Sequence, residues 1–303
     1  MNNNVYVRSN GSIKTISLTR IAFLLPLIIY GIYKNGIYLY KEGYTNLFGL
    51  FKPIILIILG AFIGGLVNII YEYVIKKRKD KLINVLFSSF HIEWGIILAC
   101  ISSINTNILI FSIITFIILF LSKLFKIHFN IMSIIFILIY IFHIILYNSY
   151  SYLNVYEQSK ELSLSFMDYL IGRGPGGIAC SHIILLLIAI IGLYFTNNNK
   201  TNITISSILT LIILFTLLSI FKGISISGLL FDNNYLFIMT FVATDSYTSC
   251  YTVPGEIIYG ILVGILTFIF YFVNPIIAPY IGITIVSLFN IVIDKKANLL
   301  IKN

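Results

Sequence analysis

Charged side chains are scarce in this chain. Only 10% of its 303 residues are Asp, Glu, Lys or Arg, whereas a soluble domain carries about 25%. This scarcity excludes an ordinary soluble globular protein and leaves little room for a separate soluble domain. Because 59% of the residues are hydrophobic, the composition predicts an all-α, polytopic integral membrane protein.

The residues that usually build metal or catalytic sites are also few. The three cysteines show no CxxC or metal-type spacing, and no two histidines have the i, i+4 spacing of a helical metal site. We therefore predict no metal site and no catalytic residue, and we leave open whether the chain works within an enzyme. No cleavable signal peptide is expected, because residues 1–20 are polar and the first apolar run is long enough to span a membrane. The cysteines considered for a metal site are Cys100, Cys180 and Cys250, and the histidines are His128, His143 and His182.

Apolar segments of membrane-spanning length recur along the chain. A hydrocarbon core of about 30 Å needs roughly 20 apolar residues per helix. The sequence therefore predicts about ten transmembrane helices. They are residues 18–40, 51–75, 82–103, 106–122, 131–147, 182–196, 203–221, 228–243, 256–273 and 276–293.

Lysine and arginine are divided unequally between the two sides that an even number of spans defines. Fourteen fall on one side, five of them within residues 76–81, and six on the other. Because cytoplasmic loops are enriched in positive charge, we predict cytoplasmic N and C termini in a bacterial cell membrane. We interpret the formal net charge of +9 as a consequence of the orientation of the chain in the lipid bilayer. No nucleic-acid partner is expected.

The apolar segments fall into two groups of five. In each group a short apolar helix reaches an alanine, Ala99 or Ala243, and a break rich in Ser, Thr or Asn follows. Five spans per half would invert the second half relative to the first, and inverted repeats with broken helices suit a translocation path. The predicted segments are a cytoplasmic N-terminal segment (1–17), a first half (18–147), an extracytoplasmic loop (148–181), a second half (182–293) and a cytoplasmic tail (294–303).

The break after Ala243 is the most informative stretch of the sequence. A dozen polar or turn-forming residues separate two apolar helices, and the second helix resumes at about Glu256. In hydrocarbon, irregular backbone survives only where protein buries it or where it lines a cavity. The break is therefore a candidate site.

The same stretch resembles the closing signature of the family that contains the B-type subunit of Nqr and the D-type subunit of Rnf. That pattern is an Ala-Thr-Asp, a Thr-Ser, a Thr, a Gly and an Ile-Tyr/Phe-Gly…Gly-Leu-Thr helix. Weaker similarity covers the opening residues 5–33, the helix GIILACI, the Phe129-Asn130 pair and the glycine-rich turn 172–177. The residues that match the closing signature in order are Ala243, Thr244, Asp245, Thr248, Ser249, Thr252, Gly255, Tyr259, Gly260, Gly264, Leu266 and Thr267.

The resemblance implies a D-type membrane subunit of an Rnf/Nqr-like complex that passes electrons via flavin and contributes to coupled Na⁺ or H⁺ translocation. Its partners would be the other subunits, including iron–sulfur and flavin-carrier subunits. Independently of the resemblance, Glu93 and Asp245 are the candidate ion-path residues, because a charged residue at membrane depth is costly and usually functional or paired. The implied flavin-proximal residues are Gly172, Pro175, Gly176, Thr244, Asp245, Thr248, Ser249, Thr252 and Gly255.

Other interpretations of these residues stay open. Asp245 before Ser and Thr is also a good helix N-cap, and Glu93 could lie one turn inside the cytoplasmic face and reach Lys81 or water. The glycine-rich turn 172–177 could be only a tight turn into a helix. At the level of function, the alternatives are a small-solute channel or transporter of similar architecture, and a non-redox scaffold for flavinylated partners.

One family motif is missing. The family usually carries FMN on the threonine of a Ser-Gly-Ala-Thr sequence between the fifth and sixth spans, and this chain has no such sequence. Ser163 and Ser165 lie in that interval without the small neighbours that would admit a flavin transferase. We therefore expect FMN or riboflavin to be non-covalent if either is bound.

This expectation predicts the outcome of a denaturation experiment. After acid precipitation of the purified protein, any absorbance near ~450 nm should move wholly to the supernatant, and the denatured band should not fluoresce on a gel. Flavin that stays with the pellet would show a covalent site that the sequence does not reveal.

Overall fold

The computed structural model describes residues 12–152, 164–196, 199–223 and 225–302, and every regular element within these ranges is helical. Parts of the predicted segments 1–17, 148–181 and 294–303 lie outside the described residues. The first-half elements are α1 (Ile13–Ile32), η1 (Tyr33–Tyr38), α2 (Leu39–Lys41), α3 (Leu47–Ile69), η2 (Ile70–Ile75), α4 (Leu82–Leu86), α5 (His91–Ile101), α6 (Ile108–Phe125) and α7 (Ile131–Tyr147). The later elements are α8 (Phe166–Ile171), α9 (Ile183–Thr196), α10 (Thr201–Lys222), α11 (Ile226–Phe231), α12 (Tyr235–Phe241), α13 (Val253–Tyr271), α14 (Ala278–Leu288) and α15 (Asn290–Lys302).

Long apolar helices confirm an all-α, polytopic membrane protein. Five helical stretches among the described residues are long and apolar enough to span: 13–41, 47–75, 108–125, 201–222 and 253–271. A sixth would be the pair α14 and α15, which is bent by 61°. Three shorter apolar helices, α5, α7 and α9, pack beside them.

Three of the predicted spans are not continuous helices, and one of them is residues 276–293, which form α14 and the start of α15. Residues 82–103 form α4 and α5, with Ser88 and Ser89 in the turn between them, and residues 228–243 form parts of α11 and α12 around Asn234. Asn234 adopts a left-handed conformation with φ 61°, which a helix interior does not accept. At 11 and 7 residues, α5 and α12 extend only about 16 and 10 Å. Each is a half-helix that ends inside the protein.

Side-chain caps start the helices that follow the breaks. Asn107 accepts a hydrogen bond from Leu109 N at the start of α6, and Asn130 accepts one from Ser133 N at the start of α7. Thr252 accepts one from Gly255 N at the start of α13, where Pro254 occupies the first turn. These caps satisfy backbone N–H groups that a helix leaves unpaired.

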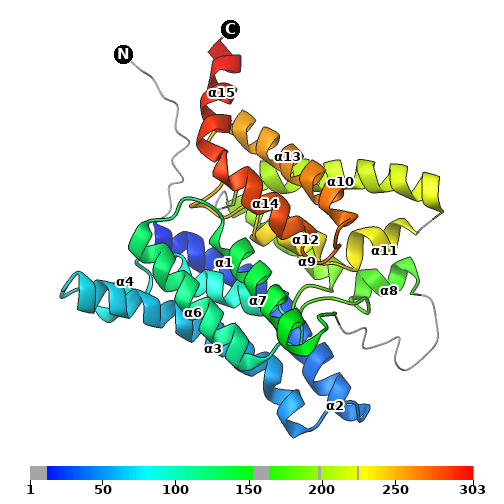
Figure 1. Ribbon diagram of the computed structural model, residues 1–303, viewed down its shortest axis with the longest axis horizontal. Coiled ribbons are helices and arrows are strands. Elements are labelled where there is room, and N and C mark those ends of the chain that lie inside the picture. Colours follow the sequence, from blue (N-terminus) through cyan, green and yellow to red (C-terminus); the bar gives the residue numbers. More distant parts are fainter. Residues whose placement is uncertain (1–11, 153–163, 197–198, 224, 303) are drawn as a thin grey trace.

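The helix contacts repeat between the two halves. Pairing α1 with α9, α3 with α10, α4 with α11, α5 with α12, α6 with α13 and α7 with α14 gives equivalent neighbours in both halves: α3 touches α4, α5 and α6, as α10 touches α11, α12 and α13. The halves meet where equivalent helices touch, α1 with α9 and α7 with α14. Figure 1 shows the blue-to-green helices on one side and most of the yellow-to-red ones on the other. This is the contact pattern that an internal repeat predicts.

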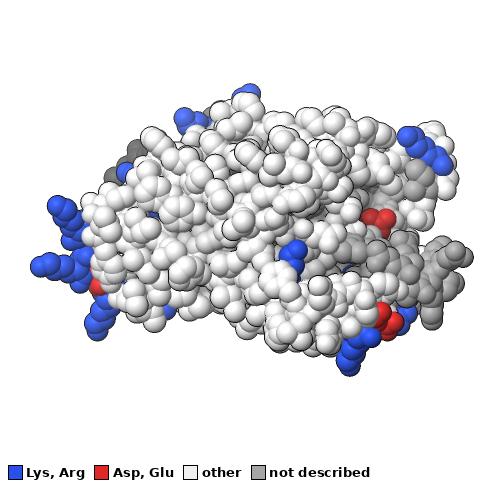
Figure 2. Space-filling model, turned by 60° about the horizontal axis from the view of Figure 1, so that its bottom comes forward, with Lys and Arg blue, Asp and Glu red and all other residues white. Residues whose placement is uncertain are grey.

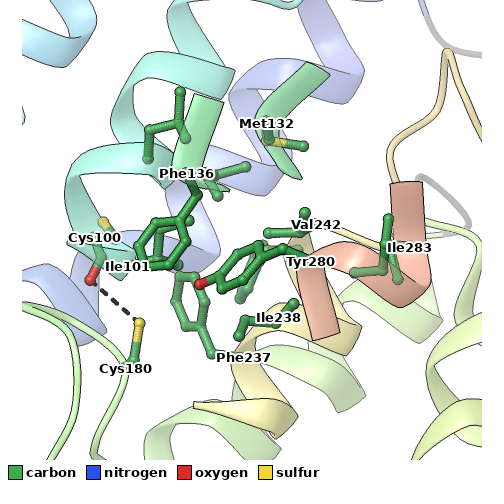
Figure 3. Packing of buried hydrophobic residues seen from close by; sticks show 14 of the residues in the cluster. Cys100, Ile101, Met132, Phe136, Cys180, Phe237, Ile238, Val242, Tyr280 and Ile283 are labelled. Atoms are coloured by element: carbon green, nitrogen blue, oxygen red, sulfur yellow. Dashed lines mark hydrogen bonds between the residues drawn. The ribbon is translucent and has the colours of Figure 1, made fainter. Parts of the chain in front are cut away.

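An aromatic stack lies on the contact between α7 and α14. The rings of Phe136 and Tyr280 stack at a centroid distance of 4.0 Å, and both side chains are fully buried. Figure 3 shows this stack beside Phe237 of α12 and Ile101 of α5. Phe136 and Tyr280 lie 144 positions apart in the sequence, as do Ala99 and Ala243. Equivalent positions of the two halves therefore meet at the centre of the core.

Figure 2 shows most charged side chains at the edges of a largely uncharged face, with a cation also within it. Two cations that were counted as loop charges are instead buried. Arg20 is 0% and Lys34 1% exposed, and Lys34 donates to the Gly174 carbonyl. Arg20 is therefore an intramembrane charge and does not belong among the loop charges that indicate orientation. When it is left out, its side of the membrane still has more cations than the other side.

The α3–α5 contact depends on glycines that let two backbones touch. A Cβ atom added at Gly64 would lie 2.2 Å from the His91 carbonyl oxygen, and one at Gly60 would lie 2.2 Å from the Gly95 carbonyl oxygen. Small residues at i and i+4 are the usual means by which membrane helices approach closely. This contact positions α5, which carries Glu93 and Trp94.

Gly64→Ala is expected to destabilise the protein by about 1–3 kcal/mol, because its methyl group meets rigid backbone and forces α3 and α5 apart. Gly65→Ala is the matched control, since a Cβ at Gly65 comes no nearer than 3.3 Å, to a methyl group of Leu86. Thermal unfolding in detergent checks the pair. Equal melting temperatures for the two variants would contradict the close α3–α5 packing.

Candidate functional site

The end of α12 is held by side chains from distant parts of the chain. Arg20 Nη2 donates to the Phe241 carbonyl, and Asn130 Nδ2 donates to the Val242 carbonyl at 2.8 Å. Thr244 Oγ1 donates to the Thr240 carbonyl. The last carbonyls of a helix have no partner within it, and water is not available in hydrocarbon. The donors from α1 and from the start of α7 therefore allow α12 to end at this depth.

A fully buried ion pair joins α1 to α5. Arg20 Nη1 lies 2.8 Å from Glu93 Oε1, and both side chains are 0% exposed. The interpretation of Glu93 as an interfacial residue that reaches Lys81 or water is therefore wrong, because its carboxylate points inward to Arg20. Breaking such a pair is costly, since one uncompensated charge stays buried.

The next residue of α5 connects this pair to the break. Trp94 Nε1 donates to Asp245 Oδ1 at 2.8 Å. The other carboxylate oxygen of Asp245 accepts from Thr248 N at 3.1 Å and Thr248 Oγ1 at 2.7 Å. Asp245 thus closes a turn inside the break, whereas the N-cap of α13 is Thr252. We call Arg20, Glu93, Trp94 and Asp245 the buried polar network.

Lys200 and α15 hold the far side of the break. Lys200 Nζ donates to the carbonyls of Ser246 at 3.2 Å and Ser249 at 3.1 Å. Asp294 accepts from Tyr251 N, Thr252 N and Thr252 Oγ1. Asn290 Nδ2 donates to the Thr248 carbonyl at 2.8 Å. The irregular backbone of the break is therefore bound from several sides by side chains of this chain.

Negative charge exceeds positive charge around the break. Burial lowers the pKa of Lys200 to about 8, an effect that the carboxylates of Asp245, Glu256 and Asp294 oppose. When Arg20 is counted with Lys200, and Glu93 with the three carboxylates just named, the region contains two cations and four carboxylates. Glu93 and Asp245 are buried, whereas Glu256 and Asp294 are only half-buried, so the cost of an uncompensated carboxylate falls mainly on the first two.

Apart from the ion-pair contact between Arg20 Nη1 and Glu93 Oε1, several polar atoms of this pair are unsatisfied. Both carboxylate oxygens of Glu93, and Nε and Nη1 of Arg20, lack a hydrogen-bond partner among the described residues. The described residues also contain no group of three or more His, Cys, Asp or Glu side chains that could hold a metal ion.

The glycine-rich turn lies at the other end of α12. Gly172 ends α8 with φ 89°, and Gly177 N donates to Asn234 Oδ1, the side chain that precedes α12. The seven residues of α12, about 10 Å of helix, separate this turn from the break. The structure therefore does not bring the predicted residues Gly172, Pro175 and Gly176 together with those of the break.

Several of the groups that the turn and the break could offer to a flavin are engaged within the chain. The N–H groups of Ile178 and Ala179 already donate to the carbonyls of Ser102 and Cys100, and a Cβ at Gly176 would meet Asn234 at 2.6 Å. Thr244, Thr248, Ser249 and Thr252 are likewise engaged, and the N–H of Gly255 donates to Thr252. Beside the turn, four buried polar atoms have no hydrogen-bond partner among the described residues: Tyr152 Oη, Ser181 Oγ, Asn234 Nδ2 and Tyr280 Oη.

Sequence reasoning missed Arg20, Trp94 and Asn130 as members of the site. Arg20 was counted only among the cations of the cytoplasmic side, although it falls within the predicted span 18–40. A signal was available, since a cation and an acid inside spans usually pair with each other. Nothing in the sequence shows that Asn130 reaches the end of α12, because that contact joins residues 112 positions apart.

Comparison with known proteins gives one family. The model of the NQR2, RnfD, RnfE family matches residues 1–297. A search of curated proteins finds no match. The family match covers both halves of the fold, the buried polar network and the break.

The ion pair predicts a coupling that a double-mutant cycle can measure. Arg20→Met should cost about 3–5 kcal/mol because it leaves Glu93 charged and buried, and Glu93→Gln should cost a similar amount. The double variant should lose clearly less than the sum of the two. Unfolding in detergent can be followed through the fluorescence of Trp94, the only tryptophan in the chain. Additive losses would show that the pair does not form.

Proposed function

Because the chain belongs to the NQR2, RnfD, RnfE family, we propose that it is a D-type subunit that contributes to Na⁺ or H⁺ translocation in an Rnf/Nqr-type electron transport complex. The family makes it a membrane subunit of such a complex. The observation that supports an ion path in this chain is the buried polar network, in which Glu93 and Asp245 lie at the junction of two half-helices.

The network has the properties that transient binding of a cation requires. Glu93 is desolvated and paired on one side only, and Asp245 belongs to an irregular segment between α12 and α13. A cation or proton that enters would offset the excess of carboxylates, and Arg20 would limit how tightly it binds. Weak and reversible occupancy is what a translocation path needs.

Electron passage via flavin is the second part of the proposal, and it is supported by family membership alone. FMN or riboflavin would be bound without a covalent link. Since the hydrogen-bonding groups of the turn and the break are engaged within the chain, we assign no step to flavin here. We propose that other subunits, including iron–sulfur and flavin-carrier subunits, are needed for turnover in a bacterial cell membrane, with both termini cytoplasmic.

The ion path predicts a response from Trp94, whose indole donates to Asp245. Titration of the purified protein with Na⁺ at fixed ionic strength, or with H⁺, should shift the emission of Trp94 because the charge beside the indole changes. Asp245→Asn should raise the cation concentration at the midpoint of this shift about tenfold or more, corresponding to a loss of at least ~1.4 kcal/mol of cation affinity. A response to Na⁺ alone or to pH alone would identify the coupling ion.

The control is Asp168→Asn, which removes a carboxylate from the partly exposed Asp168–Arg173 pair outside the network. It should leave the titration unchanged. Emission that responds to neither Na⁺ nor pH in the wild-type protein would contradict the ion path. In liposomes, solute flux through the protein alone would favour the transporter interpretation. Purification without flavin in the presence of all partners, and without flux, would favour a scaffold.

A further inference from the structure

An apolar groove opens on the membrane-facing surface between α3 and α6. Its volume is about 480 Å³. The one polar residue in its lining, Ser112, donates to the Ile108 carbonyl within its own helix, so the groove offers no free hydrogen-bonding group there. The lining residues are Leu59, Phe62, Ile63, Leu66, Ser112, Ile113, Phe116 and Ile117.

Both helices of the groove end in a cluster of cations. The loop after η2 contains Lys76, Lys77, Arg78, Lys79 and Lys81, all exposed, and the last turn of α6 contains Lys123. Lys76, Arg78 and Lys123 share a single carboxylate, Glu72, at 3.4, 3.5 and 3.8 Å. We call these six cations the basic end. Only Asp80 and Glu72 are available nearby in the sequence to balance them, so positive charge remains.

The distances suit one lipid leaflet. From Lys123, the groove residues Ile117 and Ser112 lie 6 and 11 positions back along α6, which is about 9 and 16 Å. Half of a ~30 Å hydrocarbon core is about 15 Å. The surface between the groove and the basic end stays apolar and open to lipid, with Val74 65% exposed on η2 and Leu121 36% exposed on α6.

We propose that this groove and the basic end form a binding site for an anionic phospholipid. One acyl chain would lie in the groove, and the phosphate and headgroup would contact the cations near Glu72. A basic loop alone is explained by topology. Topology does not explain why a groove and a basic loop occur together. Here the same two helices provide an apolar groove at the depth of the acyl chains and a cluster of cations at the depth of the headgroups.

Binding of phosphatidylglycerol and phosphatidylcholine with identical acyl chains, measured by native mass spectrometry of the detergent-purified protein, tests the proposal. Phosphatidylglycerol should bind more tightly. The double variant Lys76→Gln, Arg78→Gln should bind phosphatidylglycerol about thirtyfold more weakly, since each basic residue beside an anionic lipid contributes roughly five- to sixfold in affinity. Its affinity for phosphatidylcholine should be unchanged. Lys295→Gln with Lys296→Gln, which neutralises two exposed lysines of α15, is the charge control.

A second pair of variants tests the groove. Ile113→Trp should fill it and reduce the binding of both lipids, whereas Ile213→Trp places the same side chain on an equally exposed position of α10 and should not. Ile113 is 57% and Ile213 59% exposed, so both variants should fold. Equal binding of the two lipids by the wild-type protein, or equal effects of variants and controls, would overturn the proposal. Unchanged lipid binding in Ile113→Trp with loss of co-purifying subunits would assign the groove to a helix of another subunit.

Discussion

The structure depends on the need to satisfy the ends of two half-helices inside a membrane. α5 and α12 are too short to cross the hydrocarbon core, so their last carbonyls would be left without water or helix partners. The end of α5 is covered by backbone, since Ile178 N and Ala179 N donate to the carbonyls of Ser102 and Cys100. The end of α12 is covered by the side chains of Arg20 and Asn130.

This difference separates two halves that otherwise share their contact pattern. The first break is held by neutral groups, whereas the second is held by a guanidinium whose charge requires a partner. Glu93 provides that partner from α5, and Trp94 beside it holds Asp245. A repeat with equivalent contacts thus contains charge at only one of its two breaks. Function resides in local sites and not in the fold that carries them, so this difference in charge between the two breaks is the feature on which the proposed ion path rests.

The sequence predicted the helical class, the approximate positions of both breaks and the residues of the second one. Ala99 and Ala243 each precede a run of Ser, Thr and Asn that interrupts an apolar pattern, and such local patterns are visible in one dimension. It did not predict that residues 82–103 and 228–243 are divided, because short polar interruptions such as Ser88-Ser89 and Asn233-Asn234 are tolerated in many helices. Nor did it show that Arg20 meets Glu93. That pair depends on the α1–α5 contact, and pairing between distant segments leaves no periodic signal.

A chain of contacts connects the basic end to the buried polar network. Lys123 Nζ donates to Ser89 Oγ at 3.2 Å, Ser89 Oγ lies 2.5 Å from His91 Nδ1, and the rings of His91 and Trp94 are 4.9 Å apart. Contiguity alone does not establish energetic coupling, which requires an element with two arrangements that both sites bias. The start of α5 joins the two regions physically, because the same half-helix is held by glycine contacts to α3 and presents both Glu93 and Trp94.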